Sequence, residues 1–487
     1  MRVASWVRIP GRGLASARRL LSWAGAYAGM TALMLAPAVH NGFPFIFADT
    51  GGYLARPFES TLALGRSALY GAFLAAAIPL DFWPNIVIQA LACAWAMSLL
   101  LRAQGLDRPG IAASVTAVMC LATSMPWHAD LLMPDVFLPL AVAALYLLAF
   151  VSPRLRTFEI AALIALVAFA IAAHMSIFAV ALLLLALFAV VWAVGRAFIA
   201  PRPRLSLPAA AVAAGAALAL ATNYLIAGSV SFTPGGGAFL FARMLQDGFV
   251  KTHLDRNCPD AALTLCDYRD ALPTIADDWL WGFGSPLQRL GGWQAFAPQA
   301  RHIIIGSLTQ QPGAQLRAAV TGTLTQLRAV TVGDGIDNTY NWHTEWALRE
   351  YAPRVMGRFN VAAQQRGALD FRPLNVFQVP LALGATAALP ILIVLGWRRR
   401  PLAAALGLTV FTALIGNAAV CAIFSGIVDR YQNRIVWLAV LAAALICYDE
   451  RQQWRQAQRV FFSSADHESE DATRGRLLPP LPERSQD

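Results

Sequence analysis

The sequence is short of charged side chains. Asp, Glu, Lys and Arg together make up 14% of its 487 residues, whereas hydrophobic residues make up 57%. An ordinary soluble domain carries about a quarter charged residues. The mean hydropathy is +0.53. This shortage excludes an ordinary soluble enzyme and predicts that lipid surrounds most of the chain.

The sequence also lacks a basic patch interleaved with aromatic residues, although its formal net charge is +10 and its pI is about 9.7. Such a patch is the usual mark of a protein that follows nucleic-acid phosphates. The arginines instead occupy connectors between apolar runs, as in 102–108, 154–156 and 397–400. Basic connectors are typical of the cytoplasmic side of membrane proteins. We therefore expect a lipid bilayer, and no nucleic acid, as a partner.

Cysteine is scarce, with six in the chain. Four lie in apolar runs, where a lone thiol usually behaves as a small buried hydrophobic group: Cys93, Cys120, Cys421 and Cys447. Cys258 and Cys266 instead lie in a long hydrophilic segment. Residues at metal-ligand spacing do not accompany this pair, so we predict a disulfide and an oxidising compartment.

The apolar runs predict an all-α polytopic membrane protein with about ten transmembrane helices. The expected spans cover residues 22–40, 84–101, 110–125, 136–151, 158–173, 177–194, 207–226, 376–395, 403–424 and 435–448. The first follows a basic stretch and is interpreted as an uncleaved span that starts in the cytoplasm. No internal repeat is evident, which disfavours transporters built from inverted repeats.

The apolar residues 67–80 are predicted to form an interfacial or re-entrant helix, because a full span there would place the basic connector 102–108 outside. The expected organisation is a seven-span module in 1–227, a periplasmic loop domain in 228–374, and membrane helices in 375–448. A cytoplasmic tail, partly disordered, would occupy 449–487.

Candidate catalytic residues follow the first span. A carboxylate at Asp49 can accept a proton from an attacking hydroxyl, and the adjacent glycines allow a substrate to approach the backbone. Tyr53, Arg66 and Tyr70 follow as candidate substrate contacts. An equally open alternative is that Asp49 only caps a short helix.

A second group of candidates comprises His128, Asp130 and Asp135. Ionisable residues near membrane depth are costly and are usually functional, so at least one of the two carboxylates is expected to act in the site. Asp135 can alternatively be a helix cap. His174, in a tight turn on the same side, is a further substrate-binding candidate, although a lone histidine in such a turn is more often structural.

A third group opens the last span with Asp429, Arg430, Tyr431 and Arg434. The two arginines are four residues apart, which places them on one helix face, where they can grip a phosphate or pyrophosphate. Arginine on the outer side opposes the usual charge bias, which favours anion binding over interfacial anchoring.

The long hydrophilic segment adds weaker candidates. Arg243 is a possible phosphate contact, and carboxylates and an amide could hold a divalent cation: Asp247, Asp277, Asp278, Asp334, Asp337 and Asn338. The spacing around Asp334 does not complete an EF-hand loop. The indoles of Trp279, Trp281 and Trp293 could stack on sugar rings or simply pack.

These features together resemble the GT-C superfamily of membrane glycosyltransferases, which includes lipid A aminoarabinose transferases and protein O-mannosyltransferases. The resemblance covers roughly residues 20–230 and consists of Asp49 with Tyr53 in the first outer loop, the interfacial helix, seven spans before a large outer segment, and Asp130 and Asp135. The run that begins at Asp429 is similar to late helices of that group. Many members carry paired acids in the first loop, whereas here Thr50 follows Asp49.

The resemblance implies transfer of a sugar from a polyprenyl-phosphate donor to a periplasmic acceptor at a bacterial inner membrane. Asp49 would be the base and Asp135 its helper, with arginines 66, 243, 430 and 434 open to stabilise the leaving phosphate. Direct displacement would invert the anomeric centre. A transporter or flippase of a lipid-linked saccharide is the main alternative, because it needs the arginines and no base. A non-catalytic assembly factor is a third, which the several outer acids disfavour.

Overall fold

The computed structural model describes residues 11–59, 61–195, 201–228, 230–233, 235–260, 262–336 and 341–448. Those ranges are predominantly helical and contain no strand; extended pairing in them is limited to isolated bridges, such as that between Phe45 and Leu131. The predicted all-α fold is confirmed for this part of the chain. The predicted tail, 449–487, lies outside it.

The helices fall into three groups along the chain. The first comprises α1 (Gly11–Asn41), α2 (Thr50–Leu54), α3 (Ala68–Ala75), η1 (Ile78–Leu80), α4 (Trp83–Ala103), α5 (Pro109–Ala122), α6 (Met125–Ala129), η2 (Pro134–Val136), α7 (Phe137–Tyr146), η3 (Leu147–Val151), η4 (Ser152–Arg154), α8 (Thr157–Ala173), α9 (Met175–Val194) and α10 (Ser206–Ala227). The second comprises α11 (Gly236–Gln246), α12 (Phe249–Asn257), η5 (Thr264–Tyr268), α13 (Ala276–Trp281), α14 (Pro286–Arg289) and α15 (Gly292–Gln310). The third comprises α16 (Pro312–Gln326), α17 (Trp342–Tyr351), η6 (Pro353–Val355), α18 (Met356–Val361), η7 (Gln364–Arg366), α19 (Arg372–Gly396), α20 (Pro401–Phe424) and a last helix, Asp429–Tyr448.

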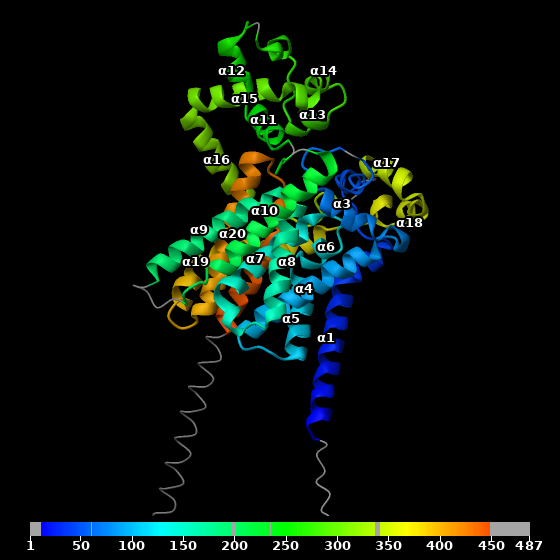
Figure 1. Ribbon diagram of the computed structural model, residues 1–487, viewed down its shortest axis with the longest axis vertical. Coiled ribbons are helices and arrows are strands. Elements are labelled where there is room, and N and C mark those ends of the chain that lie inside the picture. The colour runs from blue at the N-terminus through cyan, green and yellow to red at the C-terminus, as the bar shows by residue number, and fades with distance from the viewer. Residues whose placement is uncertain are drawn as a thin grey trace, which may run out of the picture.

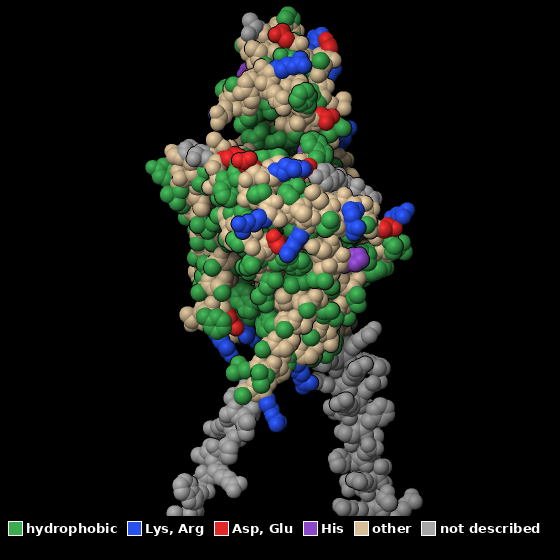
Figure 2. Space-filling view, turned by 90° about the vertical axis from the view of Figure 1, so that its right-hand side faces the viewer, with side chains coloured by type: hydrophobic (Ala, Val, Ile, Leu, Met, Phe, Trp, Pro, Cys, Tyr) green, Lys and Arg blue, Asp and Glu red, His purple; other side chains and the backbone are tan. Residues whose placement is uncertain are grey.

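Among the described residues, eight helices are long and apolar enough to cross a bilayer: Ala17–Asn41, Trp83–Ala103, Pro134–Arg154, Met175–Val194, Ser206–Ile226, Arg372–Gly396, Pro401–Phe424 and Asp429–Tyr448. Large apolar side chains on such helices face outward, among them Leu225, Val376 and Val394. Figure 2 shows apolar side chains spread over the visible face of the body, with charged groups on the lobe, on the upper part of the body and at its lower end. Because water would penalise so much exposed apolar surface, the chain is a multi-pass membrane protein.

Two further apolar helices, α5 and α8, are shorter than these eight. They coincide with two of the predicted spans, so the count of about ten stays a prediction that requires both. Within residues 67–80 the chain forms only α3, of 8 residues, and the single turn η1. Neither is long enough to cross a bilayer, which agrees with the expectation that residues 67–80 do not form a full span.

Two hydrophobic cores divide the molecule. The larger unites the membrane helices with residues 330–371, and the smaller is built from residues 238–303. We call the second unit, α11–α15, the upper lobe; it stands at one end of the helical body, and α16 leads back along α20 (Figure 1). The segment predicted as one loop domain, 228–374, is thus shared between the two cores. Cys258 and Cys266 form a disulfide inside the lobe, with an S–S distance of 2.05 Å.

Candidate functional site

A buried cluster of charged side chains, formed by Asp135, Arg430 and Arg434, joins the start of the span Pro134–Arg154 to the last helix. Asp135 Oδ2 lies 2.9 Å from Arg430 Nη1, and Asp135 Oδ1 lies 3.2 Å from Arg434 Nη1. All three side chains are buried. One carboxylate therefore neutralises and orients two guanidinium groups in surroundings where an unpaired charge would be very costly.

The local sequence explains how these groups meet. Arg430 and Arg434 are one helical turn apart, so both point to the same side of the last helix. Pro134 opens η2 after an extended residue, and this turn presents Asp135 at the mouth of the following span. The predicted convergence of the second and third groups of candidates is therefore present in the structure.

Asp49 lies on the other side of Arg430. Its Oδ1 accepts a hydrogen bond of 2.5 Å from Arg66 Nη2, and its Oδ2 is 3.9 Å from Arg430 Nη2. Asp49 occupies the N-cap position of α2, but its side chain makes no capping hydrogen bond. Because the carboxylate turns to the arginines and its side chain is 27% exposed, the simple capping alternative does not describe it.

One edge of the Arg430 guanidinium, although the side chain is buried, has no hydrogen-bond partner among the described residues. Its Nη1 binds Asp135, whereas its Nε has no hydrogen-bond partner among the described residues. Its Nη2 is too far from Asp49 for a hydrogen bond. The ring of Phe47 lies 3.9 Å from the guanidinium carbon and holds the plane of the group. Nε and Nη2 form the paired donors with which arginine binds phosphate oxygens.

Arg66 links the first loop to the upper lobe. Its guanidinium carbon is 5.6 Å from the ring centre of Tyr53 and 5.5 Å from that of Trp281. A Cβ on Gly52 would lie 3.3 Å from Arg66 Nε, so the glycine lets the side chain lie close along α2. Burial, and then the negative charge of Asp49, raise the pKa of Asp277 above its usual range. The lobe therefore brings both an indole and a carboxylate toward Asp49.

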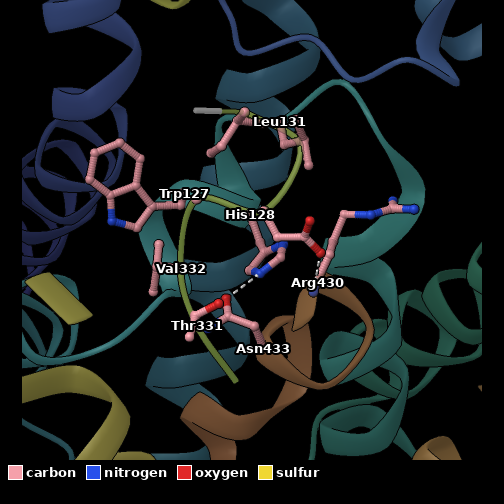
Figure 3. A pocket seen from close by; sticks show the side chains of 10 residues that line it. Trp127, His128, Leu131, Thr331, Val332, Arg430 and Asn433 are labelled. Carbon is pink, nitrogen blue, oxygen red and sulfur yellow. Dashed lines mark hydrogen bonds between the residues drawn. The ribbon is translucent and has the colours of Figure 1, made fainter. Parts of the chain in front are cut away.

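A small cavity of about 20 Å³ adjoins Arg430 and is drawn in Figure 3. His128 Nε2 and Asn433 Oδ1 are 2.8 Å apart along its wall, and the backbone amide of Arg430 donates a hydrogen bond of 3.0 Å to Asp334. Beside it is a hollow of about 710 Å³ that Asp334 and Asp429 also line. Of the cluster, Arg430 alone lines the small cavity, and Thr331, Val332 and Asp334 line both this cavity and the larger hollow.

Other predicted residues make structural contacts near the cluster. Asp130 is buried, and its Oδ2 accepts the amide of Ala38, the residue after the proline inside α1. The hydroxyl of Tyr70 donates to Gln89. His174 Nδ1 is 2.8 Å from the hydroxyl oxygen of Ser176, and this hydroxyl also receives a hydrogen bond of 3.4 Å from Arg434. Of the two carboxylates in the second group, Asp135 and not Asp130 meets the arginines.

Arg243 does not belong to this site. It lies in α11 of the upper lobe, where its guanidinium binds both carboxylate oxygens of Asp247, at 2.7 and 3.0 Å. The carboxylate of Asp429 accepts a hydrogen bond from the backbone amide of Thr331, which holds the segment around Thr331 against the last helix. Tyr431 lies with its ring 5.1 Å from the guanidinium carbon of Arg430. The structure thus gives Arg243 a carboxylate partner within the lobe, and a contact with phosphate stays a prediction.

A divalent cation stays a prediction. In the described part of the chain, no three His, Cys, Asp or Glu residues are grouped as a cation would need. Two of the proposed oxygen donors, Asp337 and Asn338, lie outside the described residues. Of the same segment, Asp334 is described and bonds the last helix.

Sequence reasoning missed several residues of the site. Phe47 was not identified as the ring beneath Arg430, and Asn433 was not identified as the partner of His128. Thr344 was also missed; its hydroxyl accepts the amide of Gly51 at 3.2 Å and fixes the loop of Asp49 against α17. Asn433 lies three residues after Arg430, so helical periodicity alone could have placed it on the same face.

Comparison of the chain with family models, with curated proteins and with solved structures finds no match. The coarse conclusion that the structure supports is a helical, multi-pass membrane protein.

Proposed function

We propose that this protein is a glycosyltransferase that moves a sugar from a polyprenyl-phosphate donor to a periplasmic acceptor. The observation that carries the proposal is the Nε and Nη2 edge of Arg430, which has no hydrogen-bond partner among the described residues and lies beside the half-buried carboxylate of Asp49. A phosphate-binding edge next to a candidate base matches the two needs of this reaction. The resemblance to GT-C enzymes points to the same chemistry.

The proposed reaction is a single displacement. The acceptor hydroxyl gives its proton to Asp49 as its oxygen forms a bond to the anomeric carbon. The bond from that carbon to the phosphate oxygen breaks, and the electron pair leaves with polyprenyl phosphate. Arg430 and Arg66 stabilise the phosphate charge. Asp135, held by Arg430 and Arg434, positions these groups; it is less suited to accept a proton, because both of its oxygens face guanidinium groups.

The proposed orientation places the upper lobe in the periplasm of a bacterial inner membrane and the N-terminus in the cytoplasm. The described chain begins and ends at the face of the body opposite the lobe (Figure 1), as an even number of spans requires. The connector between α4 and α5, which is basic, lies at that face too. The disulfide in the lobe suits an oxidising compartment. The polyprenyl chain would lie against the lipid-facing helices.

Asp49→Asn tests the proposal. Purified protein in liposomes would be given undecaprenyl-phosphate-linked hexoses and pentoses together with an extract of envelope glycans and lipids, and labelled sugar in the acceptor fraction would be measured. We expect about a 10²- to 10⁴-fold loss of transfer, the usual contribution of a general base. Asp81→Asn is the matched control, because Asp81 pairs with Arg358 away from the cluster.

The same liposomes distinguish the enzyme from a transporter. Fluorescent donor lipid in the inner leaflet reports movement between leaflets while the transfer assay runs. Wild-type protein that moved the donor and transferred no sugar, with Asp49→Asn equally active in movement, would overturn the enzyme and support the transporter.

A further inference from the structure

The short helix α13 of the upper lobe turns its two tryptophans in opposite directions. Trp279 is fully buried in the lobe core, with its ring 5.1 Å from that of Phe241 and 5.4 Å from that of Phe296. Trp281 is 47% exposed and faces the guanidinium of Arg66 in the first loop. The packing of the lobe therefore explains Trp279 and leaves the outer surface of Trp281 unexplained.

Asp277 shares the face of Trp281. The two residues are four positions apart on α13, so their side chains lie one above the other on the side turned toward Arg66. The influence of Asp49 on Asp277 agrees with that direction. Asp278, the next residue, is rotated away from this face by about 100°. The Asp277 carboxylate and the exposed indole of Trp281 thus share the face of α13 that is turned toward Arg66, the hydrogen-bond partner of Asp49.

This combination suits a carbohydrate. The apolar C–H face of a sugar ring stacks on an aromatic ring, and its hydroxyls donate to carboxylates and accept from guanidinium groups. A lipid acceptor would favour an apolar surface continuous with the membrane helices, whereas here two charged side chains flank the indole. Helix α13 also belongs to the upper lobe, which stands at one end of the helical body (Figure 1).

We propose that the α13 face formed by Asp277 and Trp281, together with Arg66, binds the acceptor and that the acceptor is a glycan. The inference rests on the proposed function and gives it a substrate class. The glycan ring lies on Trp281, and Asp277 accepts hydrogen bonds from its hydroxyls. The reacting hydroxyl is then directed toward Asp49.

A binding experiment tests this inference without requiring catalysis. Full-length protein in lipid nanodiscs would be applied to an array of synthetic bacterial envelope oligosaccharides, and the dissociation constant for the bound oligosaccharides would be measured. Trp281→Ala and Asp277→Asn should each weaken binding about tenfold, which corresponds to one stacked ring or one lost charged hydrogen bond. Trp346→Ala and Asp278→Asn are controls: Trp346 is 48% exposed but lies on α17, and Asp278 neighbours Asp277.

Two results would overturn the inference: wild-type protein that bound no oligosaccharide, or Trp281→Ala protein that bound as tightly as wild type. Its failure differs from that of the proposed function. If the protein transferred sugar to a lipid or protein acceptor but bound no oligosaccharide on the array, the proposed glycosyltransferase function would be supported and the proposal of a glycan acceptor would be wrong. If the array showed Trp281-dependent binding but Asp49→Asn did not reduce transfer, the assignment of the base would fail instead.

Discussion

The guanidinium group of Arg430 lies between two carboxylates in very different surroundings. On one side, Asp135 is fully buried and both of its oxygens contact arginine. On the other, Asp49 is partly exposed, contacts Arg66 and lies at a longer distance from Arg430. Asp135 is buried and both of its oxygens have partners, so it can hold the arginines in place. Asp49 is partly exposed to solvent, so a ligand can reach it. The same residue types thus support different roles according to burial.

The largest expected effect comes from replacing the buried carboxylate, and it is a loss of stability of the folded protein. Asp135→Asn removes the only carboxylate that the described residues place against both Arg430 and Arg434, and leaves two buried guanidinium groups without their counter-charge. We expect a loss of about 3–5 kcal/mol in the free energy of unfolding, as for other buried ion pairs with one partner removed. Denaturant unfolding of the protein in detergent micelles would measure it.

Asp49→Asn is the matched comparison for that experiment. It makes the same chemical change to a partly exposed carboxylate, so it should cost under about 1 kcal/mol of stability while abolishing most of the proposed transfer. Equal stability losses in the two variants would contradict the division of roles in which Asp135 holds the arginines in place and Asp49 reacts.

A smaller effect is expected from Arg66→Lys. Lysine keeps the positive charge but loses the planar group that lies between the rings of Tyr53 and Trp281 and binds Asp49. We expect kcat/KM for the donor to fall about tenfold to a hundredfold, with little change in unfolding. Arg349→Lys, an exposed pair partner of Glu345 on α17, should leave kcat/KM unchanged; a similar fall there would mean that the assay reports general damage.

Hydrophobicity and charge were enough to predict the eight long apolar helices and the absence of a span in residues 67–80, because both depend on local composition. The same reasoning selected Asp49, Asp135, Arg430 and Arg434, since ionisable groups near membrane depth are rarely idle. It could not separate Asp135 from Asp130. Asp130 meets an amide 92 positions away and Asp135 meets an arginine 295 positions away, and no local pattern encodes which partner each one finds.

The tryptophans of the lobe show the same limit. Trp279 and Trp281 are two residues apart in a short helix, and either could have been the exposed ring. Their difference depends on which face of α13 covers Phe241 and Phe296 and which covers Arg66. That choice is made by packing between the lobe and the first loop, which a single sequence does not reveal.

The smallest expected effect tests whether Asp277 senses the charge of Asp49. Burial and the charge of Asp49 raise its pKa above the usual 3.8 in the folded protein, so the protonated form is favoured by folding. Its contribution to stability is therefore present below pH 3.8 and is lost as the pH rises through the raised pKa. The melting temperature of wild type relative to Asp277→Asn should fall by about one degree as the pH increases through this window, because solvent screens a partly exposed group. Asp278→Asn removes a lesser of the negative charges that raise the pKa of Asp277, so it should reduce the pH trend without abolishing it; a trend that vanished in Asp278→Asn and persisted in Asp277→Asn would show that the titrating carboxylate is the neighbouring one.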